Sequence, residues 1–194
     1  MKPIGSPAKR RWQLKQAASV IQAGGIIAYP TEGVYGLGCD PENSVTVERL
    51  LLLKQRPAKK GLILIASSIE QLEPYIKPLD TPTLKKIKAT WPGSVTWILP
   101  AYENIPPYLS REDKTIAVRV TAHPVAAALC TVTNQALVST SANTSGHHPA
   151  RTPLQVRNIF RSNIDYIVHG ATGSTGTPTE IRDSRSGKIL RSGN

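Results

Sequence analysis

The chain has 194 residues, a length that suits one domain, or two at most, and that is sufficient to bury a hydrophobic core. Its 24 lysines and arginines outnumber its 13 aspartates and glutamates, so its net charge is +11 at pH 7. This charge favours anionic partners such as nucleotides or nucleic acid, and the alternative is a solvated basic surface. No apolar run approaches the ~18 residues that a membrane-spanning helix requires, so we expect no membrane contact.

The N-terminus is basic, with four lysines and arginines in residues 1–11. No apolar stretch follows them, which argues against a secretory signal. We therefore expect residues 1–11 to be a basic flexible tail and residues 12–194 to be a single domain. Residues 12–23 are predicted to form a helix that ends at Gly24-Gly25, because Leu14, Ala17, Ala18 and Ile21 recur at helical spacing.

Residues 25–30 are predicted to form a short buried strand, followed by a glycine-rich loop. The loop glycines Gly33, Gly36 and Gly38 read G-x-x-G-x-G, the reverse of the dinucleotide fingerprint, and no G-x-x-x-x-G-K-[ST] phosphate loop occurs. Residues 45–55 are predicted to form the next helix, with Ser44 as its N-cap and Pro57 as its limit.

Lys54 and Arg56 lie at the end of this second helix, close in sequence to the glycine loop. Glycines let a backbone approach a ligand, and the two cations can form charge-assisted bonds to anionic oxygens. The combination predicts a pocket for a phosphate-bearing molecule. Taken singly, either cation is equally well explained as an ordinary residue of a helix C-terminus.

The rest of the chain alternates between strand and helix patterns. Strands are predicted at 62–66, 95–99, 115–120, 137–140, 166–168 and 188–191, and helices at 69–76, 83–90, 124–132 and 153–160. Alternation of this kind is typical of α/β proteins, and antiparallel pieces around 95–120 favour a mixed sheet. The small-residue segment 170–176 is either a mobile loop that covers another part of the protein or a linker.

The cysteines and histidines do not form a recognisable metal motif. Cys39 and Cys130 are far apart and match no metal-ligand spacing. We expect both to be buried thiols in a reduced, cytoplasmic protein. His147 and His148 lie in a polar loop and are expected to be solvated rather than ligating. We therefore expect no protein-held metal.

Several hydroxyl, amide and cationic residues fall at predicted strand ends, where ligands of open α/β sheets collect. Thr115 and Arg119 are four apart on one strand, so their side chains share a face. Arg119 lies in the apolar run Ile-Ala-Val-Arg-Val, and a buried arginine requires a partner. The remaining candidates are Thr31, Ser139, Ser141, Asn143, Thr179 and Arg191, although the serines and Asn143 are also compatible with a polar turn.

At these residues the sequence resembles the YrdC-like family of threonylcarbamoyl-AMP synthases, in particular its short bacterial members of the TsaC type. The matching segments occur in the family's order and at compatible spacing over roughly residues 12–193; they are 29–38, 53–57, 91–93, 116–120, 139–146, 178–183 and 190–191. The resemblance implies a twisted α/β sheet of mixed parallel and antiparallel strands, flanked by helices, with a large positively charged cavity.

The resemblance also implies an activity. A member of this family is an ATP-dependent nucleotidyltransferase that makes threonylcarbamoyl-AMP and pyrophosphate from L-threonine, bicarbonate or CO2, and ATP. Downstream transferase proteins then modify an adenosine next to the anticodon of tRNA. The scarcity of carboxylates implies that any Mg2+ is held by the nucleotide and water.

The family's site residues carry over by position. Thr31, Arg119, Ser139 and Thr179 would bind threonine, and Thr179 stands where relatives often have serine. Lys54 and Arg56 would be catalytic and would also bind ATP, together with Thr115, Ser141, Asn143 and Arg191.

A non-catalytic RNA-binding module is the alternative, because a basic surface can grip phosphates without aromatic residues. In that case tRNA or double-stranded RNA would be the partner. The feature that separates the two hypotheses is Arg119, since a surface binder has no need of an inward-facing cation.

Overall fold

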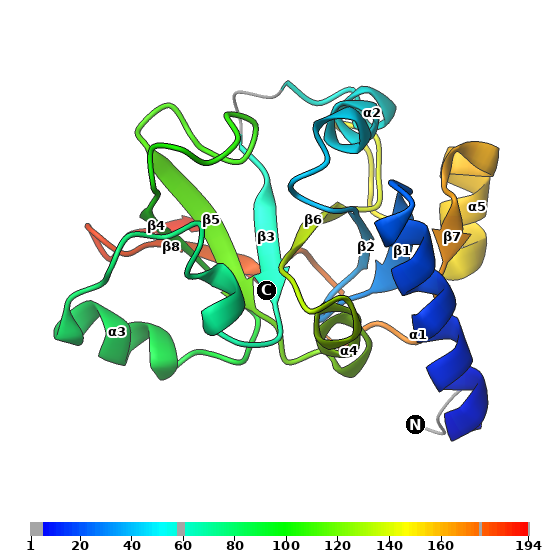
Figure 1. Ribbon diagram of the computed structural model, residues 1–194, viewed down its shortest axis with the longest axis horizontal. Coiled ribbons are helices and arrows are strands. Elements are labelled where there is room, and N and C mark those ends of the chain that lie inside the picture. The colour runs from blue at the N-terminus through cyan, green and yellow to red at the C-terminus, as the bar shows by residue number, and fades with distance from the viewer. Residues whose placement is uncertain (1–5, 58–60, 175, 194) are drawn as a thin grey trace.

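The computed structural model describes residues 6–57, 61–174 and 176–193 of the chain (Figure 1). The α-helices of this part are α1 Pro7–Gln22, α2 Ser44–Lys54, α3 Thr81–Lys88, α4 Pro124–Thr133 and α5 Pro153–Phe160, with 3₁₀ helices η2 Glu70–Leu72 and η3 Arg161–Asn163. Its strands are β1 Ile27–Pro30, β2 Tyr35–Gly38, β3 Ile63–Ala66, β4 Val95–Pro100, β5 Thr115–Val120, β6 Leu137–Ser141, β7 Tyr166–Ile167, β8 Glu180–Asp183 and β9 Ile189–Arg191.

Helix α1 begins earlier than its apolar pattern predicts. The Ser6 side chain accepts a hydrogen bond from the backbone N–H of Lys9, and Pro7 occupies the first turn. A serine cap followed by proline is a strong start signal, and it lies within the segment that we expected to be a flexible tail. That expectation was wrong for residues 7–11, which are helical, and residues 1–5 lie outside the described residues.

The expected glycine loop is mostly a strand. Tyr35–Gly38 pairs antiparallel with β1, so only the residues before Tyr35 form the turn. A Cβ on Gly38 would lie 2.5 Å from the Val138 carbonyl oxygen. Gly38 is therefore required for the close approach of β2 and β6 rather than for contact with a ligand.

Three smaller expectations also differ from the structure. Asn43, not Ser44, caps α2, because its Oδ1 accepts the Thr46 N–H at 3.0 Å. The short helix predicted at residues 69–76 is present only as the three-residue 3₁₀ helix η2, Glu70–Leu72. Strand β8 was not predicted; it is part of a sheet because β4 and β9 flank it, not because of its own alternation.

The strands form one nine-stranded sheet in the order β7-β1-β2-β6-β3-β5-β4-β8-β9. Pairs β1–β7, β3–β5 and β4–β8 are parallel, whereas the other neighbouring pairs are antiparallel. The prediction of a mixed sheet is thus confirmed. As Figure 1 shows, helices lie on both sides of the sheet, and β8 and β9 come from the far end of the chain to its left-hand edge.

The two faces of the sheet carry separate hydrophobic clusters. Alternate residues of β1 divide between them, with Ala28 on the face shared with α2 and α5 and Ile27 on the face shared with α1 and α4. The α1–α4 cluster extends across the sheet as far as Ile65 of β3 and Leu137 of β6. Beyond these two residues the same face continues onto β5 with Arg119, which pairs with Ile65 in register. The candidate site begins at this point.

Candidate active site in a cavity on the sheet

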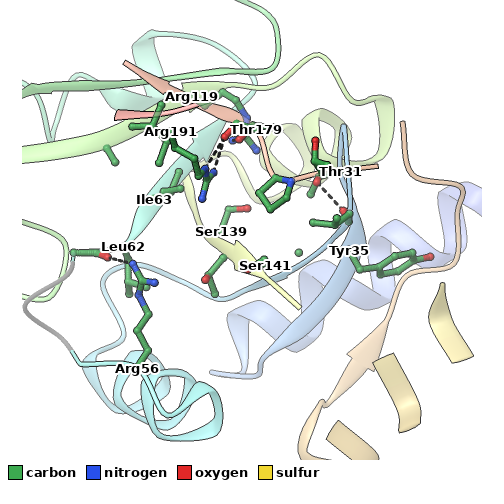
Figure 2. A pocket seen from close by; sticks show the side chains of 18 of the residues that line it. Thr31, Tyr35, Arg56, Leu62, Ile63, Arg119, Ser139, Ser141, Thr179 and Arg191 are labelled. Carbon is green, nitrogen blue, oxygen red and sulfur yellow. Dashed lines mark hydrogen bonds between the residues drawn. The ribbon is translucent and has the colours of Figure 1, made fainter. Parts of the chain in front are cut away.

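A cavity with a volume of about 120 Å³ lies next to the α1–α4 cluster on this face (Figure 2). Strand register explains its composition, because Ile63 lies opposite both Ala117 and Ser139, and Gly36 lies opposite Ser141. Residues paired in this way project from the same face of a sheet. The cations of its lining are Arg56, Arg111, Arg119 and Arg191, and its hydroxyls include Thr31, Ser139, Ser141 and Thr179.

Arg119 is held at both terminal nitrogens of its guanidinium group. Its Nη1 donates to the hydroxyls of Thr96 and Thr179, each at 2.9 Å, and its Nη2 lies 3.5 Å from Oε2 of Glu32. The side chain is only 4% exposed, yet its buried Nε–H has no hydrogen-bond acceptor within the described residues. A buried cation with an unused donor, in the wall of a cavity, is suited to an anionic ligand.

Glu32 is the counter-charge of Arg119. Its Oε1 accepts hydrogen bonds from the Thr121 hydroxyl at 2.5 Å and from the Ala122 N–H at 3.1 Å. Burial alone would raise the pKa of Glu32, but the Arg119 charge and the Thr121 hydrogen bond outweigh it, and the pKa falls below its usual value. The carboxylate is therefore ionised, and it pairs with Nη2 of Arg119 while Thr179 accepts from Nη1.

The chain after β7 is hydrogen-bonded to two residues of the cavity lining, Tyr35 and Thr31. The Tyr35 hydroxyl donates to the Gly170 carbonyl at 2.7 Å and accepts the Gly170 N–H at 3.1 Å. Gly173 N–H donates to the Thr31 carbonyl at 2.9 Å, and a Cβ at Gly173 would lie 2.1 Å from the Glu32 carbonyl oxygen. The described residues of 170–176 thus pack against the residues that line the cavity, as a loop over it would, rather than running free as a linker.

Two further guanidinium groups of the lining, those of Arg191 and Arg56, enter from different elements. Nε and Nη2 of Arg191 donate to the Thr179 carbonyl at 3.0 and 2.6 Å, and Nη2 of Arg56 donates to the Gly61 carbonyl at 3.0 Å. Figure 2 shows Arg56 at one end of the cavity and Arg119 with Arg191 at the other, with Ser139 and Ser141 between them. Burial lowers the pKa of both Arg56 and Arg191, and neighbouring guanidinium groups add to the effect.

Lys54 supports the wall of the cavity from outside the lining. Its ammonium, with the side chain 3% exposed, donates to the carbonyls of Ser141 and, at 2.7 Å, Asn143. The Ser141 hydroxyl donates to Oδ1 of Asn143 at 2.6 Å, so the loop after β6 is held on both sides. Burial, followed by repulsion from Arg56, lowers the pKa of Lys54 to about 8.

The structure thus brings most of the predicted residues together. Lining the cavity are Thr31, Arg56, Arg119, Ser139, Ser141, Thr179 and Arg191, whereas Lys54 and Asn143 contact it through the Ser141 loop. Thr115 is not in the lining: although it shares a face with Arg119, its hydroxyl donates to Oδ1 of Asp113 at 2.5 Å. The hydroxyl of Thr31 donates to the Val34 carbonyl at 2.7 Å, and its lone pairs remain for a donor on a ligand.

Sequence reasoning missed Thr96, Glu32 and Arg111. Thr96 could have been found, because a buried arginine on β5 requires an acceptor on the neighbouring strand, and Thr96 is the polar residue of β4 that faces it. Glu32 stands in the matched segment 29–38 but has no spacing signal of its own. Arg111 lies between strands in a segment without periodicity.

In the described part of the chain, no group of three or more His, Cys, Asp or Glu residues could hold a metal ion. None of the helices described is long and apolar enough to cross a membrane. Cys39 and Cys130 are buried free thiols, as predicted, and His147 and His148 are exposed.

Comparison with known proteins identifies the family. The model of the Sua5/YciO/YrdC family, described as "telomere recombination", matches residues 19–193. A threonylcarbamoyl-AMP synthase from Nitrosococcus oceani is 54% identical over 93% of this chain and 97% of its own length, and one from Halorhodospira halophila is 51% identical over 95% and 97%. The chain therefore belongs to the Sua5/YciO/YrdC family, and the expected resemblance is confirmed.

Solved structures agree with this assignment. The fold matches Escherichia coli YciO with a TM-score of 0.84 at 28% identity, covering 98% of this chain and 92% of YciO. It matches Pyrococcus abyssi Sua5, described as complexed with L-threonine, with a TM-score of 0.83 at 33% identity and 89% coverage of this chain. The chain spans about half of that Sua5, 51% of its length.

Proposed function

We propose that this protein is a threonylcarbamoyl-AMP synthase. The amine nitrogen of L-threonine bonds to the carbon of CO2, supplied as bicarbonate, and loses a proton to give a carbamate. A carbamate oxygen then attacks the α-phosphorus of ATP, the bond from that phosphorus to the β-phosphate oxygen breaks, and pyrophosphate leaves. This chemistry depends on positioning two anions and on stabilising phosphate charge, which a cation-rich cavity with few carboxylates is suited to do.

The proposal rests on one observation, the buried Arg119 guanidinium with an unused Nε–H in the cavity wall. We assign its unused Nε–H to the threonine carboxylate, with Nη1 and Nη2 held by Thr96, Thr179 and Glu32 so that the guanidinium plane is fixed. Thr31, Ser139 and Thr179 supply hydroxyls around the same point for the rest of the amino acid. Preorganisation of this kind lowers the cost of binding, because the arginine loses little freedom when the ligand arrives.

The nucleotide would lie along the remainder of the lining. Arg56, Arg191 and Ser141 face the cavity and would contact ATP directly, while Lys54 and Asn143 would act by shaping the Ser141 loop, and Thr115 by holding Asp113. The cavity volume of about 120 Å³ is below the roughly 300–1,000 Å³ usual for small-molecule sites. We therefore place threonine inside and the adenosine towards the open mouth of this positively charged cavity.

The donor set of the cavity does not suit a protein-held metal. Its charged side chains are guanidinium groups, and Glu32 is already engaged by Arg119 and Thr121. Mg2+ prefers oxygen ligands and keeps much of its water, so we expect it to accompany ATP as part of the substrate. We further propose a cytoplasmic location and a downstream transferase for tRNA as the consumer of the product.

The alternative of a non-catalytic RNA-binding module does not account for Arg119. A surface that grips phosphates needs exposed cations, whereas Arg119 is 4% exposed and shares its hydrogen bonds with two threonines. Binding of tRNA or double-stranded RNA by the exposed basic residues would be additional to the reaction.

The test is a reconstituted reaction. Purified protein with ATP, Mg2+, L-threonine and 13C-bicarbonate should release pyrophosphate, and mass spectrometry should detect threonylcarbamoyl-AMP with the labelled carbon. Omission of threonine or bicarbonate should abolish the product. Pyrophosphate release that does not depend on threonine, or no release at all beside tight salt-sensitive RNA binding, would refute the proposal.

A further inference from the structure

Arg111 is a fourth cation in the cavity wall. It lies outside the sequence segments that match the family, and it has no part in the proposed contacts to threonine and ATP. It lies in the segment between β4 and β5, where its backbone is fixed: its N–H donates to the Thr115 carbonyl at 2.8 Å, and its carbonyl accepts the Lys114 N–H at 3.0 Å. These two hydrogen bonds hold the Arg111 backbone against the start of β5, and so they fix the point from which the Arg111 side chain extends.

Arg111 and Arg56 meet at the same glycine. A Cβ on Gly61 would lie 3.1 Å from Cγ of Arg111, and the Gly61 carbonyl accepts the hydrogen bond from Arg56. The two cations are close enough that, after burial, repulsion from Arg111 is the further cause that lowers the pKa of Arg56. Two guanidinium groups placed against each other in this way cost stability unless an anion lies between them or beside them.

The donors of this pair are incompletely used. Nε of Arg56 and Nε of Arg111 are both buried, and neither has a hydrogen-bond acceptor among the residues described. Buried donors without acceptors are rare in proteins, and an absent ligand is one of their ordinary explanations. Arg119 also has an unused Nε–H, which we assign to the threonine carboxylate. The cavity therefore has unused arginine donors at two places.

The nearest carboxylate does not satisfy Arg111. Oδ1 of Asp113 is 3.9 Å from Arg111 Nε, beyond hydrogen-bond distance. The two oxygens of Asp113 are engaged more closely, Oδ1 by the Thr115 hydroxyl at 2.5 Å and Oδ2 by Nη2 of Arg185 at 2.6 Å. Asp113 therefore offsets the Arg111 charge only at ion-pair distance, and the Arg111 Nε–H next to Arg56 is left as an unused donor for a ligand.

We propose that Arg111 and Arg56 form a subsite for the β- and γ-phosphates of ATP and for the pyrophosphate that leaves. The inference rests on the proposed function for the identity of the anion. Guanidinium groups bind phosphate oxygens in a bidentate manner, so a pair of them suits a diphosphate. The subsite lies at the Gly61 side of the cavity, and in Figure 2 Arg56 is separated from Arg119 by Ser139 and Ser141. The two anionic substrates would thus bind at different ends.

Calorimetric titration with inorganic pyrophosphate, ATP and orthophosphate tests the subsite without any turnover. Arg111→Ala should bind pyrophosphate and ATP at least about 10-fold more weakly than the unchanged protein, with a smaller loss for Arg111→Lys, which keeps the charge but not the fork. Affinity for L-threonine should not change. Arg157→Ala, which removes an exposed arginine outside the cavity lining, is the matched control and should bind all ligands normally.

Arg185→Ala provides a second arm that does not touch the cavity lining. Removal of Arg185 frees Asp113 to pair with Arg111, so pyrophosphate affinity should fall by several-fold although no ligand contact is lost. Unchanged pyrophosphate affinity in a folded Arg111→Ala protein would overturn the subsite even if the protein makes the adenylate. Arginine-dependent pyrophosphate binding in a protein that makes no adenylate would support the subsite and refute the proposed reaction.

Discussion

Arg119 on β5 and Thr179, just before β8, are sixty residues apart in the chain, and the Arg119 guanidinium donates to the Thr179 hydroxyl at 2.9 Å. The backbone carbonyl of the same threonine accepts two hydrogen bonds from Arg191. Thr179 therefore connects the two arginines at one end of the cavity. It couples the C-terminal strands β8 and β9 to Arg119 on β5 and so to the proposed threonine site.

The Thr179 hydroxyl should matter for threonine rather than for ATP. In Thr179→Val, Nη1 of Arg119 keeps only Thr96 as an acceptor. Because a hydrogen bond to a charged group contributes about 1.5–3 kcal/mol, the KM for L-threonine should rise on the order of 10-fold or more, with the KM for ATP unchanged. Steady-state kinetics measures both. Thr179→Ser keeps the hydroxyl and should behave as the unchanged protein; equal effects of serine and valine would contradict this role.

The ion pair between Arg119 and Glu32 should dominate the stability of the site. Arg119→Met leaves the Glu32 carboxylate buried without its cation, and removing one partner of a buried pair costs about 3–5 kcal/mol. Urea unfolding should show this loss. The double variant with Glu32→Gln should recover most of it while remaining inactive, because the threonine carboxylate still lacks its cation. A double variant no more stable than Arg119→Met would show that the ion pair is not the cause.

Lys54 should affect both stability and turnover, and its effect should depend on pH. Its folded pKa of about 8 lies below the ordinary value of 10.5. The unfolded chain therefore holds this proton more tightly, so acid favours unfolding through this group. The contribution of Lys54 to stability should become more favourable by up to about 3 kcal/mol as the pH rises from about 8 to 10.5.

The measurement is the difference in unfolding free energy between the unchanged protein and Lys54→Met, taken at several pH values so that other titrating groups cancel. At pH 7 the variant should also lose turnover, because the carbonyls of Ser141 and Asn143 lose their donor and the cavity wall relaxes. A pH-independent difference would mean that Lys54 does not titrate in this window.

Tyr35 should control the loop that packs against the cavity lining. Tyr35→Phe removes the hydrogen bonds to Gly170, so amides of residues 170–174 should exchange with solvent faster and the KM for threonine should rise severalfold. Tyr108→Phe is the matched control, because the Tyr108 hydroxyl bonds the Pro41 carbonyl away from the cavity lining. Similar exchange in both variants would show that the Tyr35 hydroxyl does not anchor the loop.

The fold could be predicted where local patterns agree with tertiary structure. Helix α5 and strand β5 match their predicted bounds, because proline begins the first and a mostly apolar run, interrupted by Arg119, marks the second. Strand β2 could not be recognised, since its Gly-x-Gly composition is typical of a loop and only its neighbours β1 and β6 make it a strand. The start of α1 was missed because its first turns are exposed and carry no apolar stripe.

The candidate site could be predicted as a set of residue types, but not as a division of roles. An arginine in an apolar strand indicated Arg119, and register then explains why Ser139 and Ser141 share its face. Sequence could not distinguish Lys54, which supports the wall, from Arg56, which lines the cavity. They are two residues apart, and their roles differ because α2 ends at Lys54, so that Arg56 lies beyond the helix. The place of Arg111 in the cavity wall could not be predicted, because it depends on a turn whose position only the folded chain defines.

The central claim is that one cavity holds threonine against the triphosphate of ATP, and the most direct test is a crystal structure of the protein with L-threonine and a non-hydrolysable ATP analogue. We predict the threonine carboxylate at Arg119 Nε and the terminal phosphates at Arg56. Threonine bound elsewhere, or a nucleotide bound outside this cavity, would contradict the claim.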